Sequence, residues 1–287
     1  MVWRKWFVRG VVFTIVGLCA AIAVLYQRFT NPAAVRQQVL AKLQTHFPGA
    51  TASIDSARLR ILGGISVSEL RLVRNDDPDK TEILHVPSAV IYHDKQKMPG
   101  ELCVRKMELL RPRLRAERRA DGTWNLQGLT GALQPNLPLP TITIVEGTIV
   151  LEDRSTEGDV RSLELTKVEL TLVNDPMATV AIEGSAFSDV AGQVRLRGQW
   201  QRQSHVVELT ITAQQIALAG IGAGRLEKLC PNLAGLQVAG RADLQAALKY
   251  RPDESEPLVY SAQFTVTGAT LTHPKLPLPL EDVHLTA

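Results

Sequence analysis

The sequence predicts a mainly β protein attached to a membrane by one N-terminal helix. The stretch from Gly10 to Tyr26 contains no charged residue. From Ile65 onward, apolar and polar residues alternate in many short runs, which is the period of a strand with one buried face. Acidic, turn-rich connectors separate these runs, as expected for hairpins. Together these observations predict a long, mostly antiparallel β-sheet that follows an apolar segment.

The apolar segment has the features of a membrane-spanning helix. At about 1.5 Å per residue it spans roughly 25 Å, at the short end for such helices. Arg4, Lys5 and Arg9 precede it and only Arg28 follows closely, which places the N-terminus (1–9) inside. The sequence therefore predicts a single-pass membrane protein whose bulk lies on the other side of the membrane, which is a periplasm if the cell is a diderm bacterium. The anchor is expected over 10–28, with these side chains in the membrane: Gly10, Val11, Val12, Phe13, Ile15, Val16, Leu18, Ile22, Val24 and Leu25.

Two other readings of this segment involve cleavage. Ala21-Ile22-Ala23 has the small residues of a signal-peptide cleavage site, but the chain stays apolar through Tyr26 where a cleavage region turns polar. A lipid-modified Cys19 is disfavoured by the bulky Leu18 before it. A retained anchor is favoured, and a cleaved signal remains open.

Composition limits the classes of function. With 287 residues, 45% of them hydrophobic and 21% charged, the chain can form one or two folded domains. A net charge of +3 and an aromatic content of 5% argue against a nucleic-acid partner. Cys103 and Cys230 are equally compatible with a disulfide and with two buried thiols.

After the anchor, the pattern changes from helical to strand periodicity. A short amphipathic helix is predicted over Pro32–Phe47, ending at Pro48-Gly49, and it either packs on the start of the sheet or lies at the membrane surface. Its apolar positions are Val35, Val39, Leu40, Leu43 and Phe47.

The strand pattern slips between Val67 and Leu70, which suggests a β-bulge, and slips again at Lys167. The connectors 75–82, 152–159 and 251–256 are predicted as hairpin loops. The proline-rich stretch 136–140 is predicted to link a first β unit (31–135) to a second (136–287), and a further short helix is expected over Arg225–Leu233.

No pattern in the sequence points to catalysis, a cofactor or a metal site. The glycine-rich loop GIGAG at 220–224 has Arg225 where a dinucleotide fingerprint needs a third glycine, so a tight turn is favoured. The six histidines are scattered, and the carboxylate pairs Asp76-Asp77 and Glu254-Glu256 lie in charged loops. The arginine-rich run 111–119 is interpreted as a solvated strand face, with lipid headgroup contact as the alternative.

Several stretches resemble the N-terminal region of AsmA-like proteins. These are FPGATASIDSARLRILGGISVSELRLV, ILHVPSAVIY and, above all, the run from Glu108 to Leu126 in which Pro112 precedes a basic strand and DGTWNL closes it. The stretches LPLPTITIVEGTIVLED and LPLPLEDVHLTA are similar to later blocks of the family. The resemblance implies an inner-membrane-anchored protein whose periplasmic part is a long curved sheet forming an open apolar groove, related to bridge-type lipid transfer proteins.

The same resemblance implies phospholipid handling for outer-membrane and envelope homeostasis, without a catalytic set. The residues expected to form the groove wall are Leu163, Leu165, Val168, Leu170, Leu172, Val207, Leu209 and Ile211. A sandwich would cover these side chains with a second sheet, whereas a groove would leave them open to lipid. The alternative function is a non-catalytic envelope scaffold that binds proteins through its sheet edges.

Overall fold

The computed structural model of the chain describes residues 31–60, 63–77, 80–93, 104–130, 138–154, 161–189, 191–218, 237–252, 254, 256–272 and 278–286. The predicted anchor, Cys103 and Cys230, the GIGAG loop and the helix expected over Arg225–Leu233 lie outside these residues. Within the described part, no helix combines the length and apolarity that crossing a membrane requires.

The described chain is one helix followed by strands. The helix is α2 (Pro32–His46), and the strands are β1 (Ala50–Ser53), β2 (Ser56–Leu59), β3 (Ile65–Arg74), β4 (Glu82–His93), β5 (Val104–Leu110), β6 (Arg113–Arg118), β7 (Thr141–Asp153), β8 (Arg161–Val173), β9 (Thr179–Ser188), β10 (Ala191–Gln201), β11 (Val207–Ala217), β12 (Gln237–Tyr250), β13 (Leu258–Thr272) and β14 (Leu280–Thr286).

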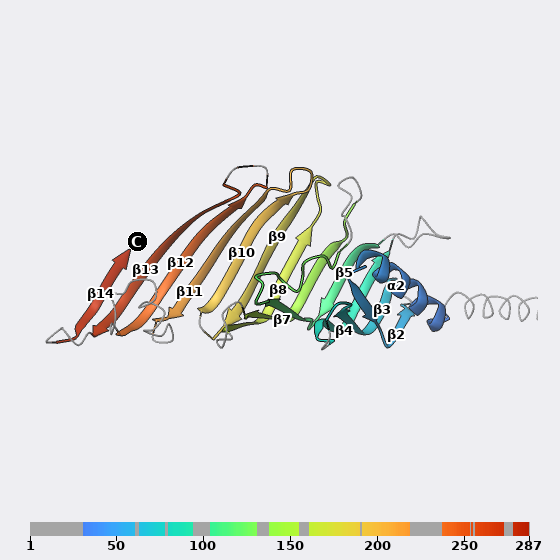
Figure 1. Cartoon of the computed structure of the whole chain (residues 1–287), viewed down its shortest axis with the longest axis horizontal. Coiled ribbons are helices and arrows are strands. Elements are labelled where there is room, and N and C mark those ends of the chain that lie inside the picture. Colours follow the sequence, from blue (N-terminus) through green and yellow to red (C-terminus); the bar gives the residue numbers. More distant parts are fainter. Residues whose placement is uncertain are drawn as a thin grey trace, which may run out of the picture.

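All of these strands belong to one 14-stranded sheet, in which chain neighbours are mostly sheet neighbours (Figure 1). The predicted mainly β, mostly antiparallel architecture is thus confirmed, as are the hairpins β3–β4, β7–β8 and β12–β13. Among the described strands, parallel pairing occurs where β7 joins β5 and β6. The sheet continues through this junction, which coincides with the predicted boundary at 136, and the division into two units stays a prediction.

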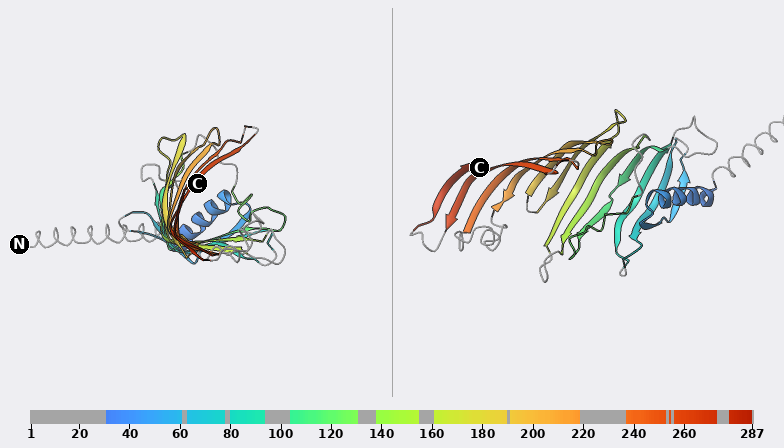
Figure 2. Two further views of the ribbon diagram at one scale, coloured as in Figure 1. Left: turned by 90° about the vertical axis from the view of Figure 1, so that its left-hand side faces the viewer. Right: turned by 45° about the horizontal axis from the view of Figure 1, so that its top comes forward.

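Helix α2 forms where the sequence predicts it. The Asn31 side chain accepts a hydrogen bond from the Ala33 amide, and Pro32 occupies the first turn, where its missing N–H costs nothing. Val35 and Val39 are its buried residues. Of the two placements that the sequence left open, the helix packs on the start of the sheet, against β1 and β2. Figure 2 shows it lying inside the curve of the sheet.

Two series of irregular residues bend the sheet. Residues with positive φ interrupt the strand alternation at Glu69, Arg111, Glu146 and Lys167 in the first series and at Gln215, Gly268 and Asp282 in the second. At Lys167 and Gln215 the register with a neighbouring strand also shifts, as in a β-bulge, which bends the strand and increases its twist. At Glu69 the register is unchanged. In each of these strands the alternation switches at the irregular residue, so apolar residues before and after it share a face. The predicted slips near Leu70 and at Lys167 are therefore real features of β3 and β8.

An acidic side chain from the next strand supports two of these irregular positions. The Glu146 amide donates to Glu169 Oε1 at 2.9 Å, and the Gln215 amide donates to Asp243 Oδ1 at 2.9 Å. Each carboxylate satisfies an N–H group at a residue with positive φ. The same arrangement occurs in β7–β8 and in β11–β12, which explains how ordinary residues rather than glycine adopt this backbone conformation.

Asp243→Ala is expected to lower the free energy of unfolding by about 1 kcal/mol, because it removes an acceptor that a charged group provides. Asp243→Asn keeps an oxygen acceptor and should lose less. Urea denaturation of the two variants checks this. Equal stability of Asp243→Ala and the parent chain would show that the carboxylate does not support the irregular backbone.

The two faces of the sheet differ in polarity. Buried apolar residues form a first cluster beneath α2, around Val67 and Val86, and a second over β11–β14, around Ala242 and Ala269. Cross-strand ion pairs occupy the other face, including Arg197 with Glu183 and Lys249 with Glu208. One face of the sheet is therefore apolar, and the other is charged and faces solvent.

Candidate functional site

The main candidate site is the apolar face of the sheet between β8 and β14. Strand register aligns its side chains in four rows, which we call the apolar face. The rows are Leu172, Ile182, Gly198, Leu209, Leu248 and Tyr260; Leu170, Gly184, Leu196, Ile211, Ala246 and Ala262; Val180, Trp200, Val207, Tyr250 and Leu258; and Ala186, Val194, Ala213, Leu244 and Phe264. None of these side chains carries a charge.

The eight predicted wall residues all lie on this side of the sheet. Leu170, Leu172, Val207, Leu209 and Ile211 belong to the rows themselves. The others, Leu163, Leu165 and Val168, extend the same face along β8. Leu165 pairs with Ser188 and Leu170 with Gly184. Since positions 184 and 188 lie on one face of the regular strand β9, the irregularity at Lys167 brings both sets of leucines to the same side.

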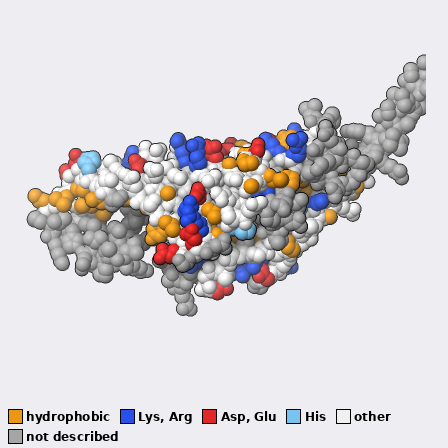
Figure 3. Space-filling model, turned by 90° about the horizontal axis from the view of Figure 1, so that it is seen from above, with side chains coloured by type: hydrophobic (Ala, Val, Ile, Leu, Met, Phe, Trp, Pro, Cys, Tyr) orange, Lys and Arg blue, Asp and Glu red, His pale blue; other side chains and the backbone are white. Residues whose placement is uncertain are grey.

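Exposure on the apolar side of the sheet is uneven: it is highest at the outer rows of the C-terminal strands, whereas Ala242, Val266 and Ala269 of β12 and β13 stay buried, at 1%, 7% and 0% exposed. Beneath α2, Val86 and Val67 are 0% and 2% exposed. At the other end Tyr260 is 74% exposed and Leu285 is 54% exposed. No second sheet lies on this face within the described residues, so the sandwich alternative does not hold for them. Figure 3, seen from above, shows hydrophobic side chains gathered at the left-hand end, over the last strands.

Two glycines on the apolar face leave room for leucine side chains of the adjacent strands. A Cβ atom at Gly198 would lie 2.6 Å from Cδ2 of Leu209, and one at Gly184 would lie 3.0 Å from Cδ1 of Leu170. The leucine side chains thus lie across the backbone of the neighbouring strand. A shallow depression of about 600 Å³ extends over β10–β13; its lining includes Gly198, Leu209, Leu248 and Tyr260 together with the charged residues Arg197, Glu208 and Lys249.

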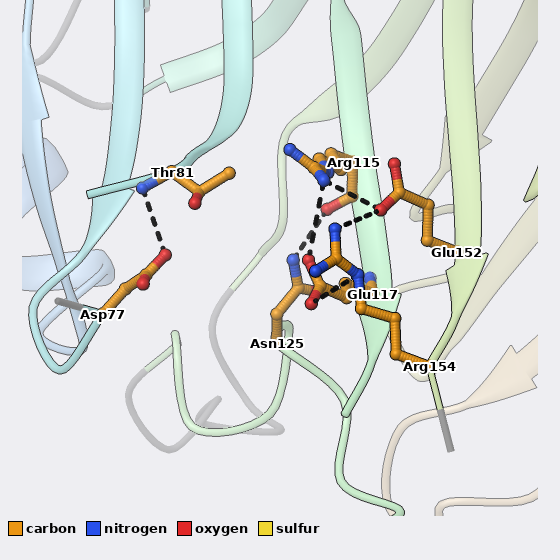
Figure 4. Close-up of polar contacts among 7 residues, drawn as sticks. All are labelled: Asp77, Thr81, Arg115, Glu117, Asn125, Glu152 and Arg154. Atoms are coloured by element: carbon orange, nitrogen blue, oxygen red, sulfur yellow. Dashed lines mark hydrogen bonds and ion pairs between the residues drawn. The ribbon is translucent and has the colours of Figure 1, made fainter. Parts of the chain in front are cut away.

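A second candidate is a polar cluster at the loop end of β6 and β7 (Figure 4). Arg115 Nη2 lies 2.8 Å from Glu152 Oε2, and Arg154 reaches both Glu152 (3.2 Å) and Glu117 (3.3 Å). Within the arginine run that is predicted to be a solvated face, Arg111 and Arg113 are exposed, whereas Arg115 is 31% exposed and its guanidinium pairs with acidic residues of its own strand and of β7. A polar hollow of about 120 Å³ separates the cluster from Asp77.

Burial alone would raise the pKa of Glu152, but hydrogen bonds from Arg115 and Arg154 outweigh it and hold the pKa below its ordinary value. A carboxyl whose pKa is lower in the folded state stabilises the fold above its unfolded pKa of about 4.3, and this contribution is lost as the pH falls through the folded pKa. We therefore expect Glu152→Gln to make the free energy of unfolding fall less steeply between about pH 5 and 3. Urea titrations across that range measure it. Parallel pH profiles for parent and variant would contradict the assignment.

Among the described residues, the other titratable side chains form no catalytic arrangement. Asp76 pairs with Arg74, and Glu254 pairs with Arg251. In the described part of the chain, no three His, Cys, Asp or Glu side chains gather closely enough to hold a metal ion. The chemistry available at the main site is therefore hydrophobic contact.

One residue that sequence reasoning placed only within a motif has a clear structural role. Asn125 of DGTWNL is 8% exposed. Its Oδ1 accepts from the Glu117 amide (2.9 Å) and its Nδ2 donates to the Arg115 carbonyl (3.0 Å). The Asn125 side chain thus makes the hydrogen bonds to the β6 backbone that a neighbouring strand would otherwise make. The buried polar residue within a polar, turn-rich stretch was the available signal, but its partners are set by the tertiary fold.

Comparison with known proteins adds no relative to this picture. No family model matches the chain, and no curated protein matches it.

Proposed function

We propose that the protein binds phospholipid acyl chains along the apolar face and handles or transports phospholipid for envelope homeostasis. The single observation that carries this proposal is an uncharged apolar face that continues across the six strands β8–β13, with no second sheet over it among the described residues. In this proposal residues 10–28 anchor the chain in the inner membrane, the sheet lies in the periplasm, and no catalytic step is involved.

The dimensions of the face suit an acyl chain. Strands are spaced by about 4.8 Å, so the distance from β8 to β14 is roughly 29 Å along the sheet. One leaflet of a bilayer contributes about half of a hydrocarbon core that is about 30 Å thick. The apolar face is thus long enough for one acyl chain to lie across the strands and to move along the face. Each methylene moved out of water contributes about 0.8 kcal/mol, and this contribution needs no specific partner.

The curvature of the sheet fits the same use. Figure 2 shows α2 on the inner side of the curve. The apolar rows lie on the same side of the sheet as the cluster beneath α2, and the ion pairs lie on the opposite side. Acyl chains on the inner side would leave headgroups at the loop edges, in water. The resemblance of the sequence to AsmA-like proteins supports this open-groove proposal, and we propose membership of that family on the same grounds.

The alternative function, an envelope scaffold, is favoured by one observation. β14 pairs with β13 alone among the described strands, and its Leu280 and Leu285 are 50% and 54% exposed. A partner protein could extend the sheet by adding a strand at this edge. The two functions predict different molecules in contact with the apolar face.

Photo-crosslinking from single positions distinguishes them. Diazirine side chains at Leu170 and Ile211 lie on the apolar face, and matched controls at Thr171 and Thr210 lie on the opposite face of the same strands. We expect lipid adducts from the first pair and none from the second when the full chain is expressed in cells. Protein adducts without lipid would favour the scaffold, and equal lipid labelling from both faces would refute the proposed site.

A further inference from the structure

We propose that α2 and the segment 122–130 form a fixed end wall of the lipid-binding face, so that acyl chains lie on β7–β14 and do not pass beneath α2. This inference rests on the proposed function and defines where on the face the lipid lies. It also limits the routes by which lipid enters or leaves.

The surface beneath α2 and the open apolar face are one continuous surface. Register connects Ile91 of β4 to Met107 of β5, Met107 to Ile142 of β7, and Ile142 to Leu172 of β8. Ile91 belongs to the cluster buried by α2, and Met107 packs against that cluster. Without α2, the apolar surface would therefore run uninterrupted from β3 to β14.

Helix α2 is packed tightly on this surface. Val39 is 2% exposed, and Ile54 and Ala57 next to it are each 1% exposed. Two side-chain hydrogen bonds to backbone carbonyls fix the helix at both ends: Arg36 Nε to Ile54 O at 2.9 Å and Gln44 Nε2 to Ala50 O at 3.0 Å. Lifting the helix would expose the main buried cluster of the described chain, which argues for a wall rather than a mobile lid.

The segment 122–130 completes the wall at the C-terminal end of α2. Leu129 is 7% exposed and shares a cluster with Ala50 and Ile83, against which Phe47 also packs. Gly49 permits this close approach, because a Cβ atom there would lie 3.1 Å from the Leu129 Cα. The segment therefore closes on the residues that follow the helix.

Polar contacts hold the segment in place. Arg74 Nη1 donates to the carbonyls of Asn125 (2.7 Å) and Gln127 (2.8 Å). The Asn125 side chain binds the backbone of β6 at Glu117 and Arg115. These four bonds join the segment to β3 on one side and β6 on the other. The DGTWNL motif thus has a mechanical role, which is to fasten the wall.

A fixed wall leaves lipid to enter over the loop edges of β7–β14, away from α2. In this part of the sheet Tyr260 and Leu285 are 74% and 54% exposed. Passage past α2 toward the residues that precede it is closed. Lipid contact should therefore stop between β4 and β8.

Locking α2 to the sheet tests whether it moves. In a chain with Cys19→Ser, Cys103→Ser and Cys230→Ser, the exposed residues Ala33 and Asp55 are replaced by cysteine and joined by a flexible bis-maleimide, which leaves the Arg36 and Gln44 hydrogen bonds in place. We expect the locked full chain to bind a fluorescent phospholipid, supplied in mixed zwitterionic and anionic vesicles, within twofold of the unlocked chain. A tenfold loss on locking, with no loss for Ala33→Cys treated alone, would show that α2 must open and would overturn the proposal.

The footprint of bound lipid gives the second readout. A small diazirine amino acid is placed at Ile91, beneath the wall, and at Leu170, beyond it, and each variant is checked for an unchanged melting temperature. Adducts from Leu170 alone support a fixed wall. Adducts from both positions overturn the wall but leave the lipid-binding function intact, whereas adducts from neither position overturn both proposals.

Discussion

Replacing both Leu209 and Ile211 by aspartate is expected to lower phospholipid affinity at least tenfold while the chain still folds. The two residues lie next to each other on β11 in the middle of the apolar face. A carboxylate that contacts an acyl chain loses its hydration without gaining a partner, and each 1.4 kcal/mol of that cost lowers affinity tenfold. Binding of a fluorescent phospholipid to the purified chain measures the effect.

The matched control places aspartate on the opposite face of β11. Thr210 and Thr212 pair with Arg197 and Arg195, so aspartate at these positions meets basic neighbours and solvent. The double variant Thr210→Asp and Thr212→Asp should bind lipid like the parent. If both double variants lose binding equally, net charge rather than the apolar face controls lipid affinity, and the proposed site is wrong.

Asn125→Ala is expected to lower the free energy of unfolding by about 2–4 kcal/mol, because it leaves two backbone groups of β6 without their partner. Asn125→Asp keeps the oxygen that accepts from the Glu117 amide and should lose about half as much. Urea denaturation followed by circular dichroism gives both values.

Two outcomes would contradict this account of Asn125. A loss below about 0.5 kcal/mol for Asn125→Ala would mean that the side chain does not hold β6, since surface changes are typically of that size. Equal losses for alanine and aspartate would mean that the oxygen contributes nothing. Either result would also weaken the case for a fastened end wall.

Local patterns predicted much of the fold. Period-2 alternation identified the strands, because one face of the sheet is apolar and the other is charged. The helix was placed to within one residue, since Pro32 favours its start and Pro48-Gly49 ends it. The predicted slip before Leu70 is real, since Glu69 has a positive φ, but the bulge is wrong: Ser68 and Leu70 keep the same register with Ser88 and Val86, so no extra residue is inserted there.

Other features depend on contacts that sequence patterns do not encode. The parallel pairing of β7 with β5 and β6 brings together segments separated by the 119–140 connection. The alternation breaks at Lys167, so the pattern alone could not decide which leucines of β8 share a face. Arg115 looks like a surface residue until Glu152 from β7 is placed beside it.

The sequence predicted the candidate site as a set of leucine, valine and isoleucine side chains on two strands. The structure shows how far the apolar face extends across the sheet. Glycines such as Gly198 mark positions where a leucine lies across the next strand, a relation that needs the register. The boundary at α2 likewise depends on the path Ile91–Met107–Ile142, which joins covered and uncovered surfaces. The membrane anchor and the state of Cys103 and Cys230 stay predictions.

The central claim is that the apolar face carries phospholipid, and mass spectrometry of lipid bound to the purified full chain tests it most directly. The chain is extracted from membranes in mild detergent beside the Leu209→Asp and Ile211→Asp double variant, and phospholipid per protein is quantified. We predict at least one phospholipid per parent chain and a loss of most of it in the variant. A folded parent chain without phospholipid, or equal lipid in both proteins, would contradict the account.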